Sequence, residues 1–464
     1  MVSFVVPPSP FLLDQKVFMT LGVLRVAAVV RDAGYPVECF SAEGGVDVSG
    51  LFHESCNIIG VTGTTPQAKD ILEIADKLPY GPLKVLGGPH ATLVNASIKT
   101  GSDRARPMLE ELEDNFDTLI FGDGELAMLD FVQRTRGQQE GTTSIDADDP
   151  KCSLFLKDLE TLPFPARDLL NPSDYHYAID GEPAASLIAQ LGCPFNCGFC
   201  GGRSSSMLRR IRLRSTKSVI DEITFLYNTQ GVKAFMFYDD ELNVNPKLLE
   251  LLTALQDLQC RLGVDFSFRG FIKAELFNES QAHEMASAGF KEILSGFESA
   301  SPKILEVINK KATVEDNTEV IRLCDKHGIR IKALMSIGHP GESEETVNDT
   351  VLWLMSEAPD DFDLSLITPY PGSPYYDRAE RQTDGSWLYE TRGEVQYQRD
   401  VDFHHDAYFY KGIPGEYDST VWTKHLTATR LVELRDQSES VARKILQLPE
   451  LTPVKAAFES SMGQ

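Results

Sequence analysis

Two series of short apolar runs, each run followed by a helical pattern, constrain the fold of this 464-residue chain more than any other feature. The first series lies within residues 1–135 and predicts five strands: VSFVV, PVECF, NIIGVT, LKVLGG and DTLIFG. The second predicts six strands between residues 186 and 367: SLIAQL, KAFMFY, VDFSF, KEILSG, IKALMSI and FDLSLI. Strands that alternate with helices form parallel sheets. We therefore predict an α/β protein with a Rossmann-like, doubly wound first domain and a partial (β/α)6 barrel.

The polar segment RGQQEGTTSIDADDPK and the extended segment LKDLETLPFPARDLL separate the two series. We place a first domain at 1–137, a linker and strap at 138–185, a barrel at 186–375 and a small, α-rich C-terminal cap at 376–464. The linker is expected to be a mobile excursion, and the cap is expected to contain a helix near 425–447. Ser215 and Ser343 are expected to cap two barrel helices.

Charge and cysteine content narrow the compartment and the partners. The formal net charge of −25 repels phosphate backbones, so neither DNA nor RNA is expected as a partner. No apolar run approaches membrane-spanning length, and the apolar start, unlike a signal peptide, is interrupted by prolines before the first basic residue, Lys16. We therefore predict a cytoplasmic protein without a membrane partner, whose cysteines are thiols or metal ligands.

Small and turn-forming residues follow four of the five strands of the first series. The carboxyl ends of parallel strands meet at one edge of the sheet, and open α/β sheets bind ligands at that edge. The four loops are therefore expected to form one site with room for a broad, flat ligand. Its residues are Pro8, Thr62, Gly63, Thr64, Thr65, Gly87, Gly88, Pro89, His90, Gly122, Asp123, Gly124 and Glu125.

Three of the eight cysteines, Cys193, Cys197 and Cys200, lie in the stretch QLGCPFNCGFCGG, after the first strand of the second series. Closely spaced thiolates suit a soft metal. A structural zinc ion takes four ligands, and because the nearest histidines in sequence are His176 and His283, zinc would need a remote fourth ligand. A four-iron cluster on three thiolates keeps one iron open for an outside ligand, which fits the spacing better. The other five cysteines stand singly and are expected to be buried or idle thiols.

The Cys-x3-Cys-x2-Cys spacing, with the aromatic Phe199 before the last cysteine, resembles the signature of radical S-adenosylmethionine (SAM) enzymes. In that family the open iron of a 4Fe-4S cluster binds SAM, which is cleaved reductively to a 5′-deoxyadenosyl radical. The stretches FYDDELNVN, GFESASPKILEVINKKATVED, GHPGESEET and PYPGSPYY are similar to the subgroup that carries an N-terminal cobalamin-binding domain. The loops GGPH and GDGE resemble that domain, and the likeness extends over about residues 1–380.

The resemblance implies a 4Fe-4S cluster, SAM and cobalamin as cofactors, and an external electron donor of the flavodoxin or ferredoxin type. It assigns the cluster to the three cysteines and cobalamin to the loop residues named above. It assigns SAM to Phe199, Asp239, Asp240, Gly296, Glu298, Ser336 and Gly338. Asp240 and Glu298 equally suit a helix cap and a helix start.

Five further residues carry expectations of their own. The strand pattern directs Arg269 into the barrel, where a buried guanidinium needs an anion, and a substrate or SAM carboxylate is a candidate. Lys310 and Lys311 suit a solvated helix end. His404 and His405, without further ligand spacing, suit the surface.

The resemblance also implies a reaction: methylation of an unactivated carbon or phosphorus centre of a small molecule by radical chemistry and methylcobalamin. Such a centre cannot be deprotonated to a nucleophile, so a radical and its cofactors are required. Cyclisation, ring rearrangement or oxidation without methyl transfer is the alternative among enzymes, and a cobalamin or iron–sulfur sensor is the alternative of another class. The first domain has no Asp-x-His-x-x-Gly motif to supply a histidine to cobalt, so a domain that has lost cobalamin also stays open.

Overall fold

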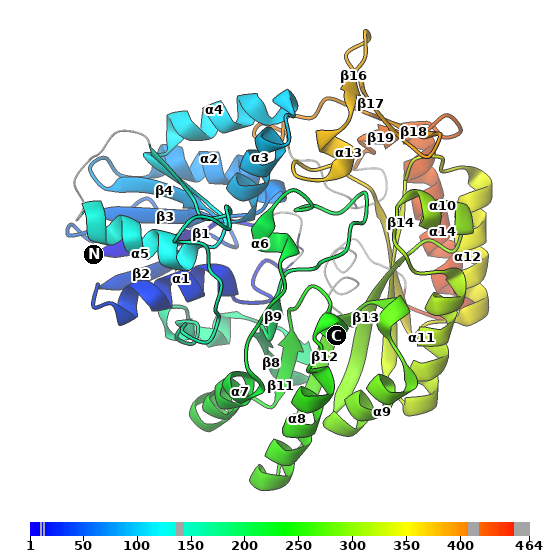
Figure 1. Cartoon of the computed structure of the whole chain (residues 1–464), viewed down its shortest axis with the longest axis horizontal. Coiled ribbons are helices and arrows are strands. Elements are labelled where there is room, and N and C mark those ends of the chain that lie inside the picture. The colour runs from blue at the N-terminus through cyan, green and yellow to red at the C-terminus, as the bar shows by residue number, and fades with distance from the viewer. Residues whose placement is uncertain (10–11, 13, 136–142, 407–416, 450–464) are drawn as a thin grey trace.

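The first series of apolar runs folds into a parallel sheet with the strand order β2-β1-β3-β4-β5-β6 (Figure 1). The computed structural model describes all residues except 10–11, 13, 136–142, 407–416 and 450–464. The strands are β1 (Val2–Val6), β2 (Val37–Ser41), β3 (Ile58–Thr62), β4 (Leu83–Gly87), β5 (Thr118–Phe121) and β6 (Thr143–Asp146). The helices are α1 (Leu21–Asp32), α2 (Ala68–Lys77), α3 (Pro89–Lys99), α4 (Arg106–Asn115) and α5 (Gly124–Thr135).

Apolar side chains on the two faces of this sheet enter two separate cores. One core joins the sheet to α1 and α5, and the other joins it to α2 and α4. The strand order reverses between β1 and β3, which is where doubly wound sheets open a crevice at their carboxyl edge. All five predicted strands and the doubly wound arrangement are confirmed.

One strand of this sheet was not predicted. β6 pairs in parallel with β5, although we placed its residues in the linker that starts at 138. The strand is short, lies at the sheet edge and exposes two of its four residues, so it lacks the apolar run from which a strand can be recognised. Residues 136–142, also expected to be mobile, lie outside the described part of the chain.

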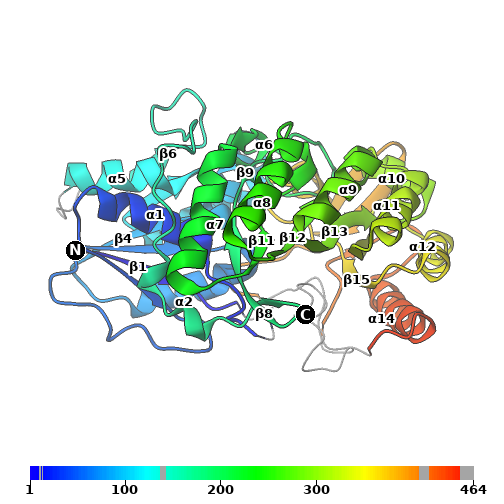
Figure 2. The ribbon, with the colours of Figure 1, turned by 90° about the horizontal axis from the view of Figure 1, so that it is seen from below.

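The second series folds into a curved sheet with the order β15-β14-β13-β12-β11-β8-β7, wrapped by helices on its outer face (Figures 1 and 2). Its strands are β7 (Ala178–Ile179), β8 (Glu182–Leu187), β11 (Ala234–Phe237), β12 (Ser267–Ile272), β13 (Phe290–Glu298), β14 (Arg330–Ile337) and β15 (Asp361–Leu366). Six strands are parallel, and only β7 is antiparallel to its neighbour among the strands of this sheet. The predicted partial (β/α)6 barrel is confirmed, with its first strand starting four residues before the expected boundary.

The outer helices cover the curved sheet, and two of them begin directly after the serines that the sequence marked as caps. They are α7 (Thr216–Gln230), α8 (Leu248–Leu262), α9 (Glu279–Ala288), α10 (Pro302–Val307), α11 (Val314–His327) and α12 (Glu344–Glu357). Ser215 accepts a hydrogen bond from the Ser218 N–H at 3.1 Å, and Ser343 accepts one from the Thr346 N–H at 3.3 Å. Both hydroxyls satisfy backbone donors that a helix start leaves unpaired, so both predicted caps are confirmed.

Side chains that point into the barrel form layers along its axis. The amino ends of the strands carry charged residues: Arg269 pairs with Glu292 at 2.5 Å, and Lys332 pairs with Asp361 at 2.9 Å. The next layer is apolar and is closed by residues from outside the barrel strands. It contains Val17, Phe18, Tyr177, Met236, Phe271, Leu294 and Leu334. The barrel therefore has a charged base and an apolar floor below its carboxyl edge.

The C-terminal region contains more than the predicted helix. The helix expected near 425–447 is α14 (Ala428–Ile445), which packs on α12 and β15. It is preceded by α13 (Pro374–Asp377) and by an antiparallel sheet of β16 (Glu380–Arg381), β17 (Trp387–Thr391), β18 (Glu394–Gln398) and β19 (Val421–Trp422). This sheet was not predicted in the α-rich cap, because its strands are short and mix aromatic with polar residues. None of the described helices is both long and apolar enough to cross a membrane.

The strap between the two domains is anchored to the barrel by buried charges. Glu222 on α7 is almost fully buried and accepts from Arg167 of the strap at 2.6 Å and from Arg214 at 2.5 Å. Arg167 also donates to the Ser186 carbonyl at 2.7 Å. One carboxylate thus neutralises two guanidinium groups that have left water.

The variant Glu222→Gln is expected to lower the free energy of unfolding by about 3 kcal/mol or more, because it leaves two buried cations without a counter-charge. The neighbouring Asp221→Asn is the control: Asp221 is half-exposed, and its one ion pair within the described residues is with exposed Lys217, so a change within about 0.5 kcal/mol is expected. Denaturation midpoints measure both. Equal midpoints for the two variants would contradict the assignment.

Candidate active site

The three clustered cysteines lie on the loop between β9 (Gln190–Leu191) and α6 (Ser206–Arg209), beyond the carboxyl end of β8. Hydrogen bonds fix this loop from two sides. The Cys193 N–H donates to the Leu208 carbonyl at 2.9 Å, and the Gly198 N–H donates to the Ile308 carbonyl at 2.8 Å. A Cβ on Gly198 would lie 3.1 Å from the Tyr375 ring, so a larger residue there would require the ring to shift. We call residues 193–200 the cluster loop.

The thiols of the cluster loop are shielded from water. Burial raises the pKa of Cys200 to about 12, and the nearby Cys197 and Cys193 raise it further. Burial also raises the pKa of Cys193. Among the described residues no three His, Cys, Asp or Glu side chains are already arranged as a metal site. The donor set nevertheless fits a soft metal cluster: three thiols on one glycine-rich, partly buried loop, which bind as thiolates and release protons on loading.

A strained glutamate lies beside the cluster loop. The pairing of β13 with β14 shifts register between Gly296 and Glu298, and Glu298 has a φ of 65°. Its carboxylate accepts from Lys310 at 3.1 Å and from the Ser336 hydroxyl at 2.8 Å. A Cβ on Gly296 would lie 2.6 Å from this carboxylate. Strain of this kind is held only where surrounding structure enforces it, and it concentrates at functional sites.

Two lysines that the sequence did not single out as functional also lie here. Lys310, expected at a solvated helix end, is buried. Burial opposes its charge, yet Glu298, Cys197 and Glu241 raise the pKa of Lys310 overall. Lys273 is buried as well, donates to the Lys310 carbonyl at 2.9 Å and lies 4.3 Å from the Phe195 ring centroid. The expectation for Lys310 was wrong because the chain turns inward after α10.

A neutral histidine completes the polar ring at this edge. His339 is fully buried, and burial lowers its pKa to about 4. Its ring nitrogens lie 2.9 Å from the Ser336 hydroxyl and 3.2 Å from the Tyr375 hydroxyl. The Phe199 ring lies 5.4 Å from the His339 ring in an edge-on contact. His339 thus links Phe199 to Ser336, and Ser336 contacts Glu298, which pairs with Lys310. We call Lys310, Glu298, Ser336 and His339, with Phe199 beside them, the polar ring.

Three other residues assigned to SAM differ in burial and in their contacts. Asp239 is buried, accepts from the Ala189 and Gln190 N–H groups at 2.8 and 3.1 Å, and has its pKa raised to about 7 by burial. It thus fixes the chain that leads into the cluster loop. Asp240 is exposed and lines the cavity described below. The Gly338 carbonyl accepts from Gln396 of the C-terminal sheet at 2.5 Å.

Arg269 does point into the barrel, as expected, but the protein itself supplies its anion. The guanidinium pairs with Glu292 and donates to the Tyr177 hydroxyl at 3.1 Å. Both contacts lie in the charged base of the barrel, at the amino end of the strands. A substrate or SAM carboxylate is therefore not needed to neutralise Arg269.

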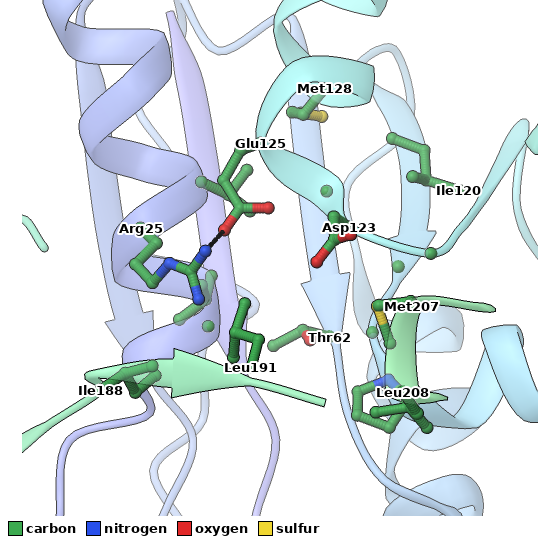
Figure 3. Close-up of a pocket in the computed structure, with 18 of the residues that line it drawn as sticks. Arg25, Thr62, Ile120, Asp123, Glu125, Met128, Ile188, Leu191, Met207 and Leu208 are labelled. Atoms are coloured by element: carbon green, nitrogen blue, oxygen red, sulfur yellow. Dashed lines mark ion pairs between the residues drawn. The ribbon is translucent and has the colours of Figure 1, made fainter. Parts of the chain in front are cut away.

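A cavity of about 280 Å³ lies between the carboxyl edge of the first sheet and the start of the barrel (Figure 3). Its upper wall consists of glycines and aliphatic side chains of the first domain. Leu191, Gly192, Met207 and Leu208, which flank the cluster loop, form the opposite wall. Arg25 and Glu125 form an ion pair of 2.6 Å at its rim, and Asp123 pairs with Arg212 across it. The cavity therefore lies between the loops of the first domain and the residues that flank the cluster loop.

Most of the loop residues predicted to bind a broad ligand line this cavity. They are Thr62, Gly87, Gly88, Pro89, Gly122, Asp123, Gly124 and Glu125. Gly88 and Gly122 both have a φ of 93°, and a Cβ would lie 2.4 Å from Thr62 Oγ1 or from the Asp148 nitrogen, respectively. Only glycine fits at these two positions. Pro8, Gly63, Thr64, Thr65 and His90 are not among the lining residues.

His90 instead joins the first domain to the C-terminal region. Its Nε2 lies 2.9 Å from Nε2 of His404, whose Nδ1 lies 2.7 Å from Glu111. His90 and His404 are both buried, whereas His405 is exposed and contacts Asp402. We expected His404 and His405 at the surface. This was wrong for His404, because it meets His90, which lies 314 residues earlier in the chain.

Comparison with known proteins agrees with this geometry. Residues 187–354 match the model of the radical SAM superfamily. An uncharacterized methyltransferase of Pyrococcus horikoshii is 30% identical over 339 residues, which cover 70% of this chain and 69% of that protein. The anaerobic magnesium-protoporphyrin IX monomethyl ester cyclase of Cereibacter sphaeroides is 28% identical over 346 residues, 71% of this chain and 54% of the cyclase. The chain thus spans about half the length of that cyclase.

A solved structure is similar over most of the fold. The radical SAM methyltransferase TsrM of Kitasatospora setae, with cobalamin and a 4Fe-4S cluster bound, aligns with a TM-score of 0.64 and 17% identity, covering 85% of this chain and 81% of that one. The chain belongs to the radical SAM superfamily and to its methyltransferase-like branch. It is therefore an enzyme that uses a 4Fe-4S cluster and SAM, as predicted.

Anaerobically reconstituted protein is expected to hold about four irons. Replacing Cys193, Cys197 or Cys200 with alanine is expected to remove most of this iron and to abolish SAM cleavage, because each thiolate is one of three protein ligands. Cys260→Ala is the control, since Cys260 is exposed on α8, away from the loop. Iron analysis and the yield of 5′-deoxyadenosine measure the outcome. Equal losses in Cys260→Ala would show that the wrong thiols were assigned.

Proposed function

We propose that this protein is a cobalamin-dependent radical SAM methyltransferase that methylates an unactivated carbon or phosphorus centre of a small molecule. The observation that carries the proposal is the cavity that the first domain shares with the residues flanking the cluster loop. A methyl donor in that cavity and SAM at the cluster would face the same barrel opening. When bound, methylcobalamin supplies a methyl group to a substrate radical.

The cavity fits one part of a corrinoid. Its walls are apolar and are formed by backbone at Gly60, Gly87, Gly88 and Gly122, which allows a flat or elongated ligand to approach closely. Its rim carries the two ion pairs described above, which can exchange hydrogen bonds with amide groups. No lining residue is a histidine, and His90 faces His404, so the described residues offer no imidazole to cobalt at this cavity.

The polar ring supports SAM binding at the cluster loop. Lys310 can neutralise the carboxylate of SAM. The neighbouring carboxylates of Glu298 and Glu241 can accept hydrogen bonds from the ammonium group of SAM. Burial raises the pKa of Glu241 to about 7, with Lys310 and Lys273 opposing this shift. Neutral His339 and the Phe199 ring would then cover the apolar part of SAM and exclude water.

The apolar floor of the barrel favours a substrate with an apolar or aromatic portion. Phe18, Phe271 and Leu334 are only half-buried. Tyr238 is 36% exposed, although its ring lies 5.0 Å from the Phe18 ring. Tyr238 also lines the cavity. A substrate resting on this floor would lie between SAM and the methyl donor, where a radical on the substrate could receive a methyl group.

Gly22 provides a direct test of the cavity. It lies on α1, lines the cavity, and a Cβ there would meet no atom within 4 Å. Gly22→Trp is therefore expected to block cobalamin binding at least tenfold by steric exclusion without displacing the backbone. Gly22→Ala is the matched control, which should keep binding and stabilise α1 by about 1 kcal/mol. Equilibrium dialysis measures both, and unchanged binding in Gly22→Trp would exclude this cavity as the cobalamin site.

The products of SAM test the reaction. Methyl transfer through cobalamin is expected to yield S-adenosylhomocysteine and 5′-deoxyadenosine in near-equal amounts, because one SAM donates its methyl group and another is cleaved. Label from a deuterated SAM methyl group is expected in the product. The similarity to a cyclase makes the opposite result informative: 5′-deoxyadenosine alone during product formation would refute methyl transfer and favour cyclisation or oxidation.

A further inference from the structure

A run of arginines follows the cluster loop in a chain whose net charge is −25. Three of these arginines bond to carbonyl or carboxylate groups of the protein. Arg203 donates to the Cys193 carbonyl at 3.2 Å, Arg212 pairs with Asp123, and Arg214 pairs with Glu222. Arg209 and Arg210 make no ion pair with a carboxylate in the described part of the chain, and Arg210 is exposed. Within the described residues, therefore, no carboxylate neutralises these two cations.

The two arginines lie at one side of the exposed strip of the cluster loop. Pro194 and Asn196 are exposed, although each is next to a cluster cysteine in sequence. Arg209 donates to the Pro194 carbonyl at 3.4 Å. Arg210 is the next residue along the chain, and its guanidinium lies 5.5 Å from the Phe155 ring centroid. The exposed strip therefore carries positive charge on the side of α6.

A third cation lies on the other side of the strip. The Asn309 side chain donates to the Asn196 carbonyl at 2.7 Å. Two residues further on, Lys311 is exposed and forms no ion pair with any described residue. Asn309 and Lys311 both adopt positive φ, 57° and 75°, so this turn holds a fixed shape beside the loop. We call Arg209, Arg210 and Lys311 the cationic rim.

We infer that the cationic rim docks an acidic protein that carries one electron, such as a flavodoxin or a ferredoxin, over Pro194–Asn196. This inference rests on membership of the radical SAM superfamily and does not depend on methyl transfer. In the step it serves, the carrier loses one electron and the cluster gains it, and no proton or group is transferred. Electron transfer requires a short path, and the strip is the exposed part of the loop that holds the cluster.

The local charge matters more than the net charge at contact distance. Salt at physiological concentration screens charges beyond about 8 Å, so the distant acidic surface neither attracts nor strongly repels a docked partner. The three cations beside the strip then orient an acidic partner and raise its association rate. They also exclude a basic partner, which would be repelled by the rim.

The test uses the holoenzyme, a purified acidic flavodoxin in its reduced state, and dithionite as a small-molecule reductant. Arg209→Glu/Arg210→Glu is expected to weaken flavodoxin binding about tenfold or more at low ionic strength, and to slow cluster reduction by flavodoxin to a similar extent. Binding is measured by surface plasmon resonance, and reduction by the loss of cluster absorbance. Reduction by dithionite should be unchanged, and the binding difference should shrink at high salt.

Two comparisons separate docking from other effects. Lys233→Glu/Lys291→Glu makes the same charge change on exposed lysines at the amino ends of β11 and β13, and is expected to leave binding unchanged. Lys311→Glu, which leaves the Arg209 contact with the loop intact, is expected to weaken binding severalfold. Binding equal to that of the control pair would overturn the inference. Slower reduction by dithionite as well would overturn it too, because the arginines would then support the loop itself.

Discussion

The ion pair between Asp123 and Arg212 links the two halves of the molecule on which the site depends. Asp123 follows the last predicted strand of the first sheet, and Arg212 follows the cluster loop and α6. Both side chains are buried. Burial raises the pKa of Asp123 to about 7, with Glu125 adding to the shift and Arg212 opposing it. A charge pair of this kind is expensive to break, so it fixes the distance across the cavity.

This constraint explains why the cavity and the polar ring lie at one place. Parallel strands bring their carboxyl ends to a common edge in each domain, and the buried pair sets the two edges face to face. The cavity then receives one wall from each domain. The segment from β9 through α6 has two roles, because its loop carries the cysteines and its two ends carry the cavity-lining Leu191, Met207 and Leu208.

The C-terminal region closes the site from the remaining side. Gln396 of β18 donates to the Gly338 carbonyl, and Tyr375 contacts both His339 and the cluster loop. His404 meets His90 beyond the edge of the first sheet. These contacts make the polar ring dry, which strengthens the electrostatic interactions within it. They also bury His339, and this burial lowers the pKa of His339 and keeps its ring neutral.

The sequence by itself determined the features that depend on local pattern: eleven strands, the capped helices, the three cysteines and the glycines of the cavity loops. Periodicity and spacing encode these because neighbouring residues share one strand, helix or turn. The tertiary structure alone decided which of these residues meet. Lys310 and His339 are both distant from Glu298 in sequence. The turn after α10 brings Lys310 to Glu298, and the end of β14 places His339 beside Ser336, which also contacts Glu298. Arg269 was correctly directed inward, but its partner Glu292 depends on the register between two strands, which no local pattern specifies.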